Sequence, residues 1–452
     1  MTGSTLTATT SATTGVSAAG HEIGYPHGHL GCLSSEEEEA LRSFKVFAEE
    51  KAAYRAGPSP SHDDQTLLYV RPLHSPGICR GILTLTNQPT NRRYLRARRW
   101  NIQDAYVQFK ETEDWRKANQ LDVLYDTIEV EPYEQARALY PRWTGRRDRR
   151  GIPLYVYEIR HLDSKTVAAY EKSAAESTDS KAKTDGTTPN KLLRLFALYE
   201  NLTRFAQPMC TELPDREHAH VPITLSTNIV DVTGVSLRMF WNLKSHMQAA
   251  SQLATAHYPE TLDRIFIIGA PYFFSTVWGW IKRWFDPVTV SKIFILSAAE
   301  VKPTLEEFID PKNIPKQYGG ELEFLFHDRP NLDPYVRDRA TWLNGHTDFP
   351  DGPLYWVPVD DGKAAIECIA IGSVNKTERR ERVCTLPRAF PSKQAETAPA
   401  AAAATTTTTE ADLQAGVQSL AIADEKPVSK DAAEISEKVP EAEAAKTATV
   451  SA

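Results

Sequence analysis

Short runs of arginine are the first residues in this chain whose types and spacing could do chemistry. They are Arg92-Arg93, Arg98-Arg99 and the four arginines that flank Asp148. A guanidinium binds a phosphate or carboxylate through two charge-assisted hydrogen bonds. The runs alone leave three interpretations open: a solvated basic face, a nuclear-import-like patch, or contact with an anionic membrane.

Motifs for enzymatic chemistry are absent from the sequence. It has no G-x-S-x-G, P-loop, G-x-G-x-x-G or H-E-x-x-H string. The histidines His21, His27 and His29 form a sparse cluster that is more often solvated than metal-bound, so no metal site is expected. Asp148 and the Asp360-Asp361 pair have no partner acid or base in the sequence pattern. The sequence therefore favours a binding protein over an enzyme.

Composition and charge argue against several other classes of protein. The 452 residues carry a formal net charge of −7, which argues against a strongly cationic nucleic-acid binder. The five cysteines contain no C-x-x-C pair, which argues against zinc and disulfide scaffolds and favours a reducing cytoplasm. The N-terminus lacks the pattern of a signal peptide. The uncharged stretch Ile265–Ile281 is 17 residues long and contains a Gly-Ala-Pro break, so it is expected to remain outside the bilayer.

The elements that must position these residues follow from hydrophobic periodicity. A helix is expected to start at Ser35 with an acidic first turn, another after Asn101, and a long one over Ser236–His257. Expected strands are 154–157, 223–232, 264–268 and 292–296. Their alternation with helices predicts an α/β fold, in which an all-helical N-terminal lobe precedes a lobe built on a mainly parallel sheet.

Eight strings, in order, resemble the CRAL-TRIO lipid-binding family. They cover about residues 36–325, and the nearest branch is the phosphatidylinositol/phosphatidylcholine transfer proteins that support Golgi secretion. The strings are DDQTLL (63–68), RYLRARRWN (93–101), ETEDWRK (111–117), DRRGIPLYVYEI (148–159), DVTGVSL (231–237), YPETLDRIFIIGAPYFFSTVW (258–278), WFDPVTVSKIFIL (284–296) and IDPKNIPKQYGG (309–320).

The resemblance implies a sheet that floors an apolar lipid cavity, closed by a gating helix that opens at a membrane. Such enclosure is physically required, because each buried CH₂ contributes about 0.8 kcal/mol and acyl chains cannot cross water unshielded. Residues 272–285 have the apolar composition of such a lid. Without the resemblance, an ordinary core helix would be the better interpretation of this stretch.

The resemblance also implies a binding site for a phosphatidylinositol headgroup. Its residues correspond to Arg98, Arg99, Glu260, Thr289 and Lys292 of this chain. The cations and the hydroxyl suit a phosphodiester, and a carboxylate can accept hydrogen bonds from inositol hydroxyls, which choline lacks. At Arg99 the family more often has Lys, so the charge is kept while the geometry changes.

The choline-lipid site that the resemblance implies is only half matched. Tyr155 and Ser226 fit the pattern, whereas Thr144 and Asn228 stand where the family has Tyr and Thr. Loss of an aromatic ring weakens the cation–π attraction for a quaternary ammonium. We therefore expect that phosphatidylinositol binding is kept and that phosphatidylcholine binding is reduced or replaced by a different second ligand.

Composition and resemblance together divide the chain. We expect disorder over 1–34, the helical lobe over 35–135, and the lipid-binding domain over 136–325 with a flexible loop at 173–190. An extension at 326–390 and a disordered acidic tail at 391–452 follow. Residues 69–92 interrupt the family's TLL–R-x-L-R-A-R helix with three Pro and two Gly, which suggests a retained intron in the gene sequence. A genuine surface loop is the alternative, and tryptic peptides of the native protein decide between them.

The predicted function is therefore phospholipid exchange between membranes. The ligand is phosphatidylinositol, with phosphatidylcholine as a second candidate, and no other cofactor is expected. The protein would act as a cytoplasmic monomer that visits Golgi or endosomal membranes, supports phosphoinositide supply and presents lipid to a phosphatidylinositol kinase, without a nucleic-acid partner. The alternative is a sensor or carrier of another hydrophobic ligand, such as a sterol, coupled to signalling.

Overall fold

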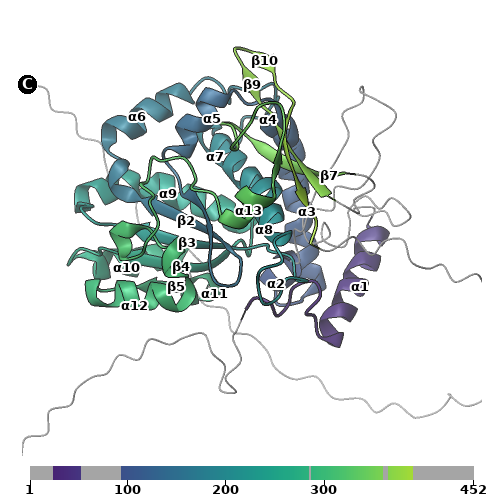
Figure 1. Cartoon of the computed structure of the whole chain (residues 1–452), viewed down its shortest axis with the longest axis horizontal. Helices are drawn as coiled ribbons and strands as arrows, with labels where there is room; N and C mark the ends of the chain where they lie inside the picture. Colours follow the sequence, from purple (N-terminus) through teal and green to yellow (C-terminus); the bar gives the residue numbers. More distant parts are fainter. Residues whose placement is uncertain (1–23, 52–92, 285–286, 360–364, 390–452) are drawn as a thin grey trace, which may run out of the picture. The chain divides into compact units, whose positions relative to one another are not determined.

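The computed structural model describes residues 24–51, 93–284, 287–359 and 365–389 (Figure 1). The helices are α1 Ser35–Glu50, α2 Arg93–Ala97, α3 Ile102–Ala118, α4 Leu121–Thr127, α5 Val130–Arg137, α6 Ser164–Ser173, α7 Asn190–Asn201, α8 Gln207–Thr211, α9 Leu237–His257, α10 Phe274–Ile281, α11 Pro287–Ser291, α12 Ala298–Phe308 and α13 Pro334–Arg339. The strands are β1 Arg142–Arg147, β2 Pro153–Glu158, β3 Ser226–Asp231, β4 Leu262–Ile268, β5 Ile293–Ile295, β6 Thr341–Trp342, β7 Leu354–Val359, β8 Ala365–Ala370, β9 Ser373–Val374, β10 Thr377–Glu378 and β11 Glu381–Pro387.

The central sheet has five strands in the order β1-β2-β3-β4-β5. Strands β2 to β5 pair in parallel, and β1 pairs with β2 as an antiparallel hairpin. The predicted α/β fold with a mainly parallel sheet is thus confirmed. The edge strand β1 was not predicted, because Arg142–Arg147 (RWTGRR) lacks the apolar alternation by which strands are recognised.

The two faces of the sheet pack against different helices, because successive side chains of a strand point to opposite sides. In β4, Ile265 and Ile267 pack with a cluster that includes residues of α5, α7 and α9. Phe266 and Ile268, which alternate with them, pack with Leu305 of α12. Figure 1 shows α9 and α12 on opposite sides of these strands.

The first helices form where their caps predict. The Ser34 side chain accepts a hydrogen bond from the Glu37 amide at 3.2 Å, and the Glu37 carboxylate accepts from the Ser34 amide at 3.0 Å. This reciprocal capping starts α1. At the start of α3, the Asn101 side chain accepts a single hydrogen bond from the Asp104 amide at 3.0 Å. Apolar residues of α1, α2 and α3, including Phe44 and Phe109, pack together as a separate small core.

Two segments that composition assigned to disorder are ordered where the structure describes them. Residues 24–34, here called the N-terminal strap, bury Tyr25 to 1% exposure. Loop 174–189 is held by Arg194, whose buried guanidinium donates to the Ser173 carbonyl at 2.8 Å and the Ser177 carbonyl at 3.2 Å. Composition missed both because the partners lie elsewhere in the chain. The predictions for residues 1–23, 69–92 and 391–452 lie outside the described residues.

The segment after the central-sheet lobe builds a second sheet, with strand order β6-β11-β8-β7. The sheet is antiparallel throughout. Its buried side chains, Trp356 among them, share one core with α8 and with the π-helical turn Leu202–Ala206 that joins α7 to α8. The predicted extension is therefore part of the same folded unit as the central sheet.

The stretch Ile265–Ile281 contains the second part of strand β4 and helix α10, separated by a turn at Gly269, whose φ is +68°. Within the described part of the chain, no helix combines the length and the apolar character that crossing a bilayer would require.

Candidate functional site

A cavity of about 350 Å³ lies between the central sheet and the helices of its α7/α9 face. All seven residues predicted for the lipid headgroups belong to its lining. They are Arg98, Arg99, Tyr155, Ser226, Glu260, Thr289 and Lys292. Because these residues come from segments almost 200 positions apart, tertiary folding rather than local sequence brings them together.

Most of the remaining wall is apolar. Helix α7 contributes Leu195 and Leu198, and α9 contributes Met247, Ala250 and Ala254. The volume is near the lower end of the range for small-ligand pockets, so two acyl chains would require the wall to move outward.

The predicted gating segment 272–285 contributes no lining residue as far as the structure describes it. Helix α10 buries Phe274 and Val277, while Tyr272 before it is 98% exposed. The helix that covers the cavity in this structure is α9, and gating by α10 stays a prediction.

A carboxylate and two cations form the mostly buried charged part of the lining. The Lys292 ammonium donates to the Glu260 carboxylate at 3.0 Å and to the Leu262 carbonyl at 3.0 Å. Both side chains are mostly buried, with 22% exposure for Lys292 and 16% for Glu260. Lys292 follows α11 directly, and the turn of that helix places Thr289 beside it, since the Lys292 amide donates to the Thr289 carbonyl at 3.1 Å.

The second cation is Arg96, which the sequence reasoning missed. Its guanidinium lies 3.9 Å from the Glu260 carboxylate and donates to the Glu260 carbonyl at 3.4 Å. Burial lowers the pKa of Arg96, and the Glu260 carboxylate opposes that effect. Arg98 and Arg99 are exposed at the rim, whereas the Arg96 side chain is only 11% exposed. The sequence offers one signal for the burial of Arg96: it directly follows the apolar residues Tyr94 and Leu95, which are buried on the same short helix.

Backbone strain is concentrated at this part of the site. Arg99, Trp100 and Glu260 adopt φ values of +50°, +63° and +54°, in the left-handed region that non-glycine residues seldom occupy. The Trp100 amide donates to the Leu95 carbonyl at 2.6 Å, which ends α2 in a tight turn. Such conformations persist where surrounding contacts enforce them, and they cluster at ligand sites.

The residues of the predicted choline site form hydrogen bonds with one another and with the backbone. The Ser226 hydroxyl donates to the Thr261 carbonyl at 3.2 Å and accepts from the Asn228 amide at 3.1 Å. Thr144 is buried and donates to the Leu154 carbonyl at 3.0 Å. Burial raises the pKa of the Tyr155 phenol well above its ordinary value, so the phenol is uncharged at neutral pH. Because the Ser226 hydroxyl donates to the Thr261 carbonyl, its proton is committed to the backbone.

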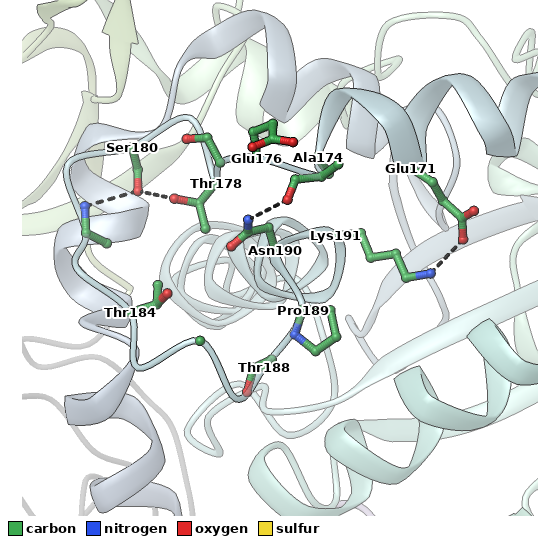
Figure 2. Close-up of a pocket in the computed structure, with 14 residues that line it drawn as sticks. Glu171, Ala174, Glu176, Thr178, Ser180, Thr184, Thr188, Pro189, Asn190 and Lys191 are labelled. Carbon is green, nitrogen blue, oxygen red and sulfur yellow. Dashed lines mark hydrogen bonds and ion pairs between the residues drawn. The ribbon is translucent and has the colours of Figure 1, made fainter.

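A second hollow, of about 600 Å³, lies under the loop between α6 and α7 (Figure 2). Its polar groups bond to one another: Lys191 donates to Glu171 at 2.6 Å, and Thr178 and Ser180 share a hydrogen bond of 2.8 Å. The Asn190 amide donates to the Ala175 carbonyl at 3.4 Å. These bonds brace the loop, and the predicted headgroup residues lie in the other cavity.

Comparison with known proteins identifies a family and several relatives that this chain resembles. Residues 141–320 match the family described as the CRAL/TRIO domain. The chain is 28% identical to the SEC14 cytosolic factor of Eremothecium gossypii over 336 residues, which cover 74% of this chain and 90% of that protein. It is 29% identical to the CRAL-TRIO domain-containing protein YKL091C of Saccharomyces cerevisiae, with 72% and 90% covered. It is also 29% identical to the phosphatidylinositol/phosphatidylcholine transfer protein SFH9 of Arabidopsis thaliana, with 54% and 40% covered.

Proposed function

We propose that this chain, a Sec14-like protein in which residues 141–320 form a CRAL/TRIO domain, binds phosphatidylinositol in the cavity and exchanges it between membranes. The observation that carries the proposal is the ion-paired group of Arg96, Glu260 and Lys292 in the wall of an otherwise largely apolar cavity. Buried charges are costly unless they are paired or bound to a ligand. A site for acyl chains alone would have no need of them.

The chemistry of the group favours an inositol headgroup. The two cations, with Arg98 and Arg99 at the rim, can donate to the oxygens of a phosphodiester. The Glu260 carboxylate can only accept hydrogen bonds, and inositol hydroxyls supply the donors that choline lacks. Phosphatidylcholine is the weaker ligand in this proposal, because the hydroxyl proton of Ser226 is committed to the Thr261 carbonyl.

The cellular part of the proposal follows from the relatives. One is named a cytosolic factor and another a phosphatidylinositol/phosphatidylcholine transfer protein. We expect a monomer that works from the cytoplasm and contacts Golgi or endosomal membranes transiently. It delivers phosphatidylinositol to a kinase, and it catalyses no covalent step itself.

A vesicle-to-vesicle transfer assay with labelled phosphatidylinositol tests the proposal. Glu260→Lys places a third cation beside Arg96 and Lys292, and transfer should fall at least about tenfold because like charges repel in a partly buried site. Glu307→Lys is the matched control, since it makes the same charge change on an exposed residue of α12. Thermal melting of all three proteins shows that each is folded. Normal transfer by Glu260→Lys would contradict the headgroup assignment.

A carrier of a compact hydrophobic ligand, such as a sterol, is the second candidate. The cavity volume favours it, since about 350 Å³ suits a small ligand better than two acyl chains. A parallel transfer assay with labelled sterol separates the two. Transfer of sterol without transfer of phosphatidylinositol by the unmodified chain would replace the first proposal by the second.

A further inference from the structure

Gln108, on α3, belongs to the lining of the cavity and is only 4% exposed. Its side-chain nitrogen Nε2 donates to two backbone carbonyls in the last turn of α9, to Thr255 at 3.1 Å and to Ala256 at 2.9 Å. A carbonyl oxygen can only accept a hydrogen bond, so the nitrogen rather than the oxygen of the amide must occupy this place. Its two partners therefore fix the orientation of the Gln108 amide.

The side-chain oxygen Oε1 of Gln108 is buried and accepts no hydrogen bond from the residues that the structure describes. A carbonyl oxygen that is kept from water without a donor costs free energy, and such groups are rare in folded proteins. Because Gln108 lines a ligand cavity, a donor carried by the ligand can satisfy this oxygen. The unpaired acceptor therefore indicates a ligand with a hydroxyl or N–H group.

The surroundings of Gln108 belong to the charged end of the cavity. Both carbonyls that its amide contacts lie in the last turn of α9, and that helix ends three residues before Glu260. The neighbouring Phe109 packs against Tyr94 with ring centroids 5.9 Å apart, and Tyr94 shares the short helix α2 with Arg96. Gln108 is thus close to the residues to which the proposed function assigns the headgroup.

We propose that Gln108 is a specificity-determining residue of the ligand site, in which its Oε1 accepts a hydrogen bond from a hydroxyl of the headgroup. The inference rests on the proposed function, since it adds a contact to the same headgroup. A polyol such as inositol carries donors for both Gln108 and Glu260, whereas the trimethylammonium group of choline has no O–H or N–H. A ligand without a donor leaves the buried oxygen unpaired, and this penalty rejects it.

Gln108 differs from Glu260 in how it contributes. The Glu260 carboxylate already accepts from Lys292 at 3.0 Å and lies 3.9 Å from the Arg96 guanidinium. The amide of Gln108 is uncharged, so it offers an acceptor without changing the balance of charge around a phosphate. Removing it should therefore change which headgroup binds, and should leave the dependence of binding on salt concentration as it is.

A competition experiment on the full chain tests the inference. The unmodified chain and Gln108→Leu are equilibrated with vesicles that contain equal amounts of phosphatidylinositol and phosphatidylcholine, and the bound lipid is quantified by headgroup-resolved mass spectrometry. Leucine fills a similar volume and has no polar atom in its side chain. The ratio of bound phosphatidylinositol to bound phosphatidylcholine should fall by about tenfold, the size expected for one buried hydrogen bond.

Two controls separate ligand contact from loss of structure. Gln108→Leu also removes the hydrogen bonds to α9, so Thr112→Val removes a comparable contact: the Thr112 hydroxyl lies 3.4 Å from the Ala256 carbonyl oxygen and 3.1 Å from Nδ1 of His257. Thr112 lies outside the lining as far as the structure describes it. Gln103→Leu makes the same substitution at an exposed position of α3. Both controls should keep the lipid ratio of the unmodified chain, and thermal melting shows whether each variant is folded.

An unchanged lipid ratio in a folded Gln108→Leu variant would overturn the inference, whether binding of both lipids is normal or is reduced equally. The first result would mean that water satisfies the oxygen, and the second that Gln108 only holds α9 in place. Failure of the unmodified chain to bind phosphatidylinositol would refute the proposed function and the inference with it, and this result is seen without any variant.

Discussion

The indole N–H of Trp356 donates to the Phe205 carbonyl at 3.1 Å, and the two rings stack with a centroid distance of 5.9 Å and an interplanar angle of 1°. Phe205 belongs to the π-helical turn Leu202–Ala206, and Leu202 in the same turn lines the cavity. Single π turns inside α-helices are often found at functional sites, and here the extension donates a hydrogen bond to one carbonyl of the turn. The C-terminal extension therefore supports the wall of the cavity directly.

Replacing Trp356 by Phe should weaken this support. The variant keeps an aromatic ring but leaves the Phe205 carbonyl buried without its donor, which costs about 1–3 kcal/mol. The free energy of unfolding, measured by urea titration, should fall by that amount. Trp342→Phe is the control, because Trp342 is only partly buried and should lose about 1 kcal/mol or less. Equal stability of Trp356→Phe and the unmodified chain would show that the hydrogen bond contributes little.

Asn228→Thr should increase binding of phosphatidylcholine, because it supplies a hydroxyl at the position where the family that the sequence resembles has Thr. Asn228 donates to the Ser226 hydroxyl at 3.1 Å and to the Ser226 carbonyl at 3.3 Å, and both bonds disappear in the variant. Headgroup-resolved mass spectrometry of co-purified lipid should find phosphatidylinositol in the unmodified chain and a several-fold higher share of phosphatidylcholine in Asn228→Thr. Asn242→Thr, on the exposed side of α9, is the control. Abundant phosphatidylcholine in the unmodified chain would contradict the expectation.

Ala250→Trp should block the cavity. Ala250 lies on α9 in the lining, and an indole there would occupy much of a volume of about 350 Å³. We expect lipid transfer to fall at least about tenfold and stability by about 1–3 kcal/mol, the usual cost of overpacking. Gln252→Trp adds the same side chain to an exposed position of the same helix and should transfer lipid normally. Undiminished transfer by Ala250→Trp would show that lipid binds elsewhere.

Because of His257, the free energy of unfolding should decrease as the pH is lowered. Its ring stacks on Trp115 at 4.2 Å, and burial, with a smaller effect of Arg116, lowers the pKa of His257 to about 4. The unfolded chain has the ordinary value near 6.5, so the unfolded state binds the proton first as the pH drops. Stability from this group is complete above about pH 6.5 and is lost between about pH 6.5 and about pH 4.

The loss between about pH 7 and about pH 5 should reach about 2 kcal/mol for this one group. Urea titrations of the unmodified chain and His257→Gln at both pH values measure it, because the variant should lose less stability on acidification by that amount. The same pH dependence in both proteins would show that other groups are responsible.

Local pattern in the sequence determined the elements of this protein. Three kinds of local signal are involved: the capping residues Ser34 and Asn101, the helical period of α9, and the apolar runs of β2 to β5. Each depends only on residues a few positions away in the sequence. Motif order then indicated Glu260, Thr289 and Lys292, and the structure brings them into one lining. These features were predictable because they depend on neighbouring residues or on strings that recur as units.

Tertiary structure alone decided which arginine of the basic run lies beside Glu260. In the sequence Arg96, Arg98 and Arg99 look alike, but the phase of α2 and the positive φ of Arg99 leave only Arg96 beside Glu260. The same holds for the ordered strap, which composition assigned to disorder. Its stability comes from contacts between Tyr25 and Val221 and between His29 and Arg96, which lie 196 and 67 positions apart. A contact across such distances depends on how the whole chain packs, and no local pattern encodes it.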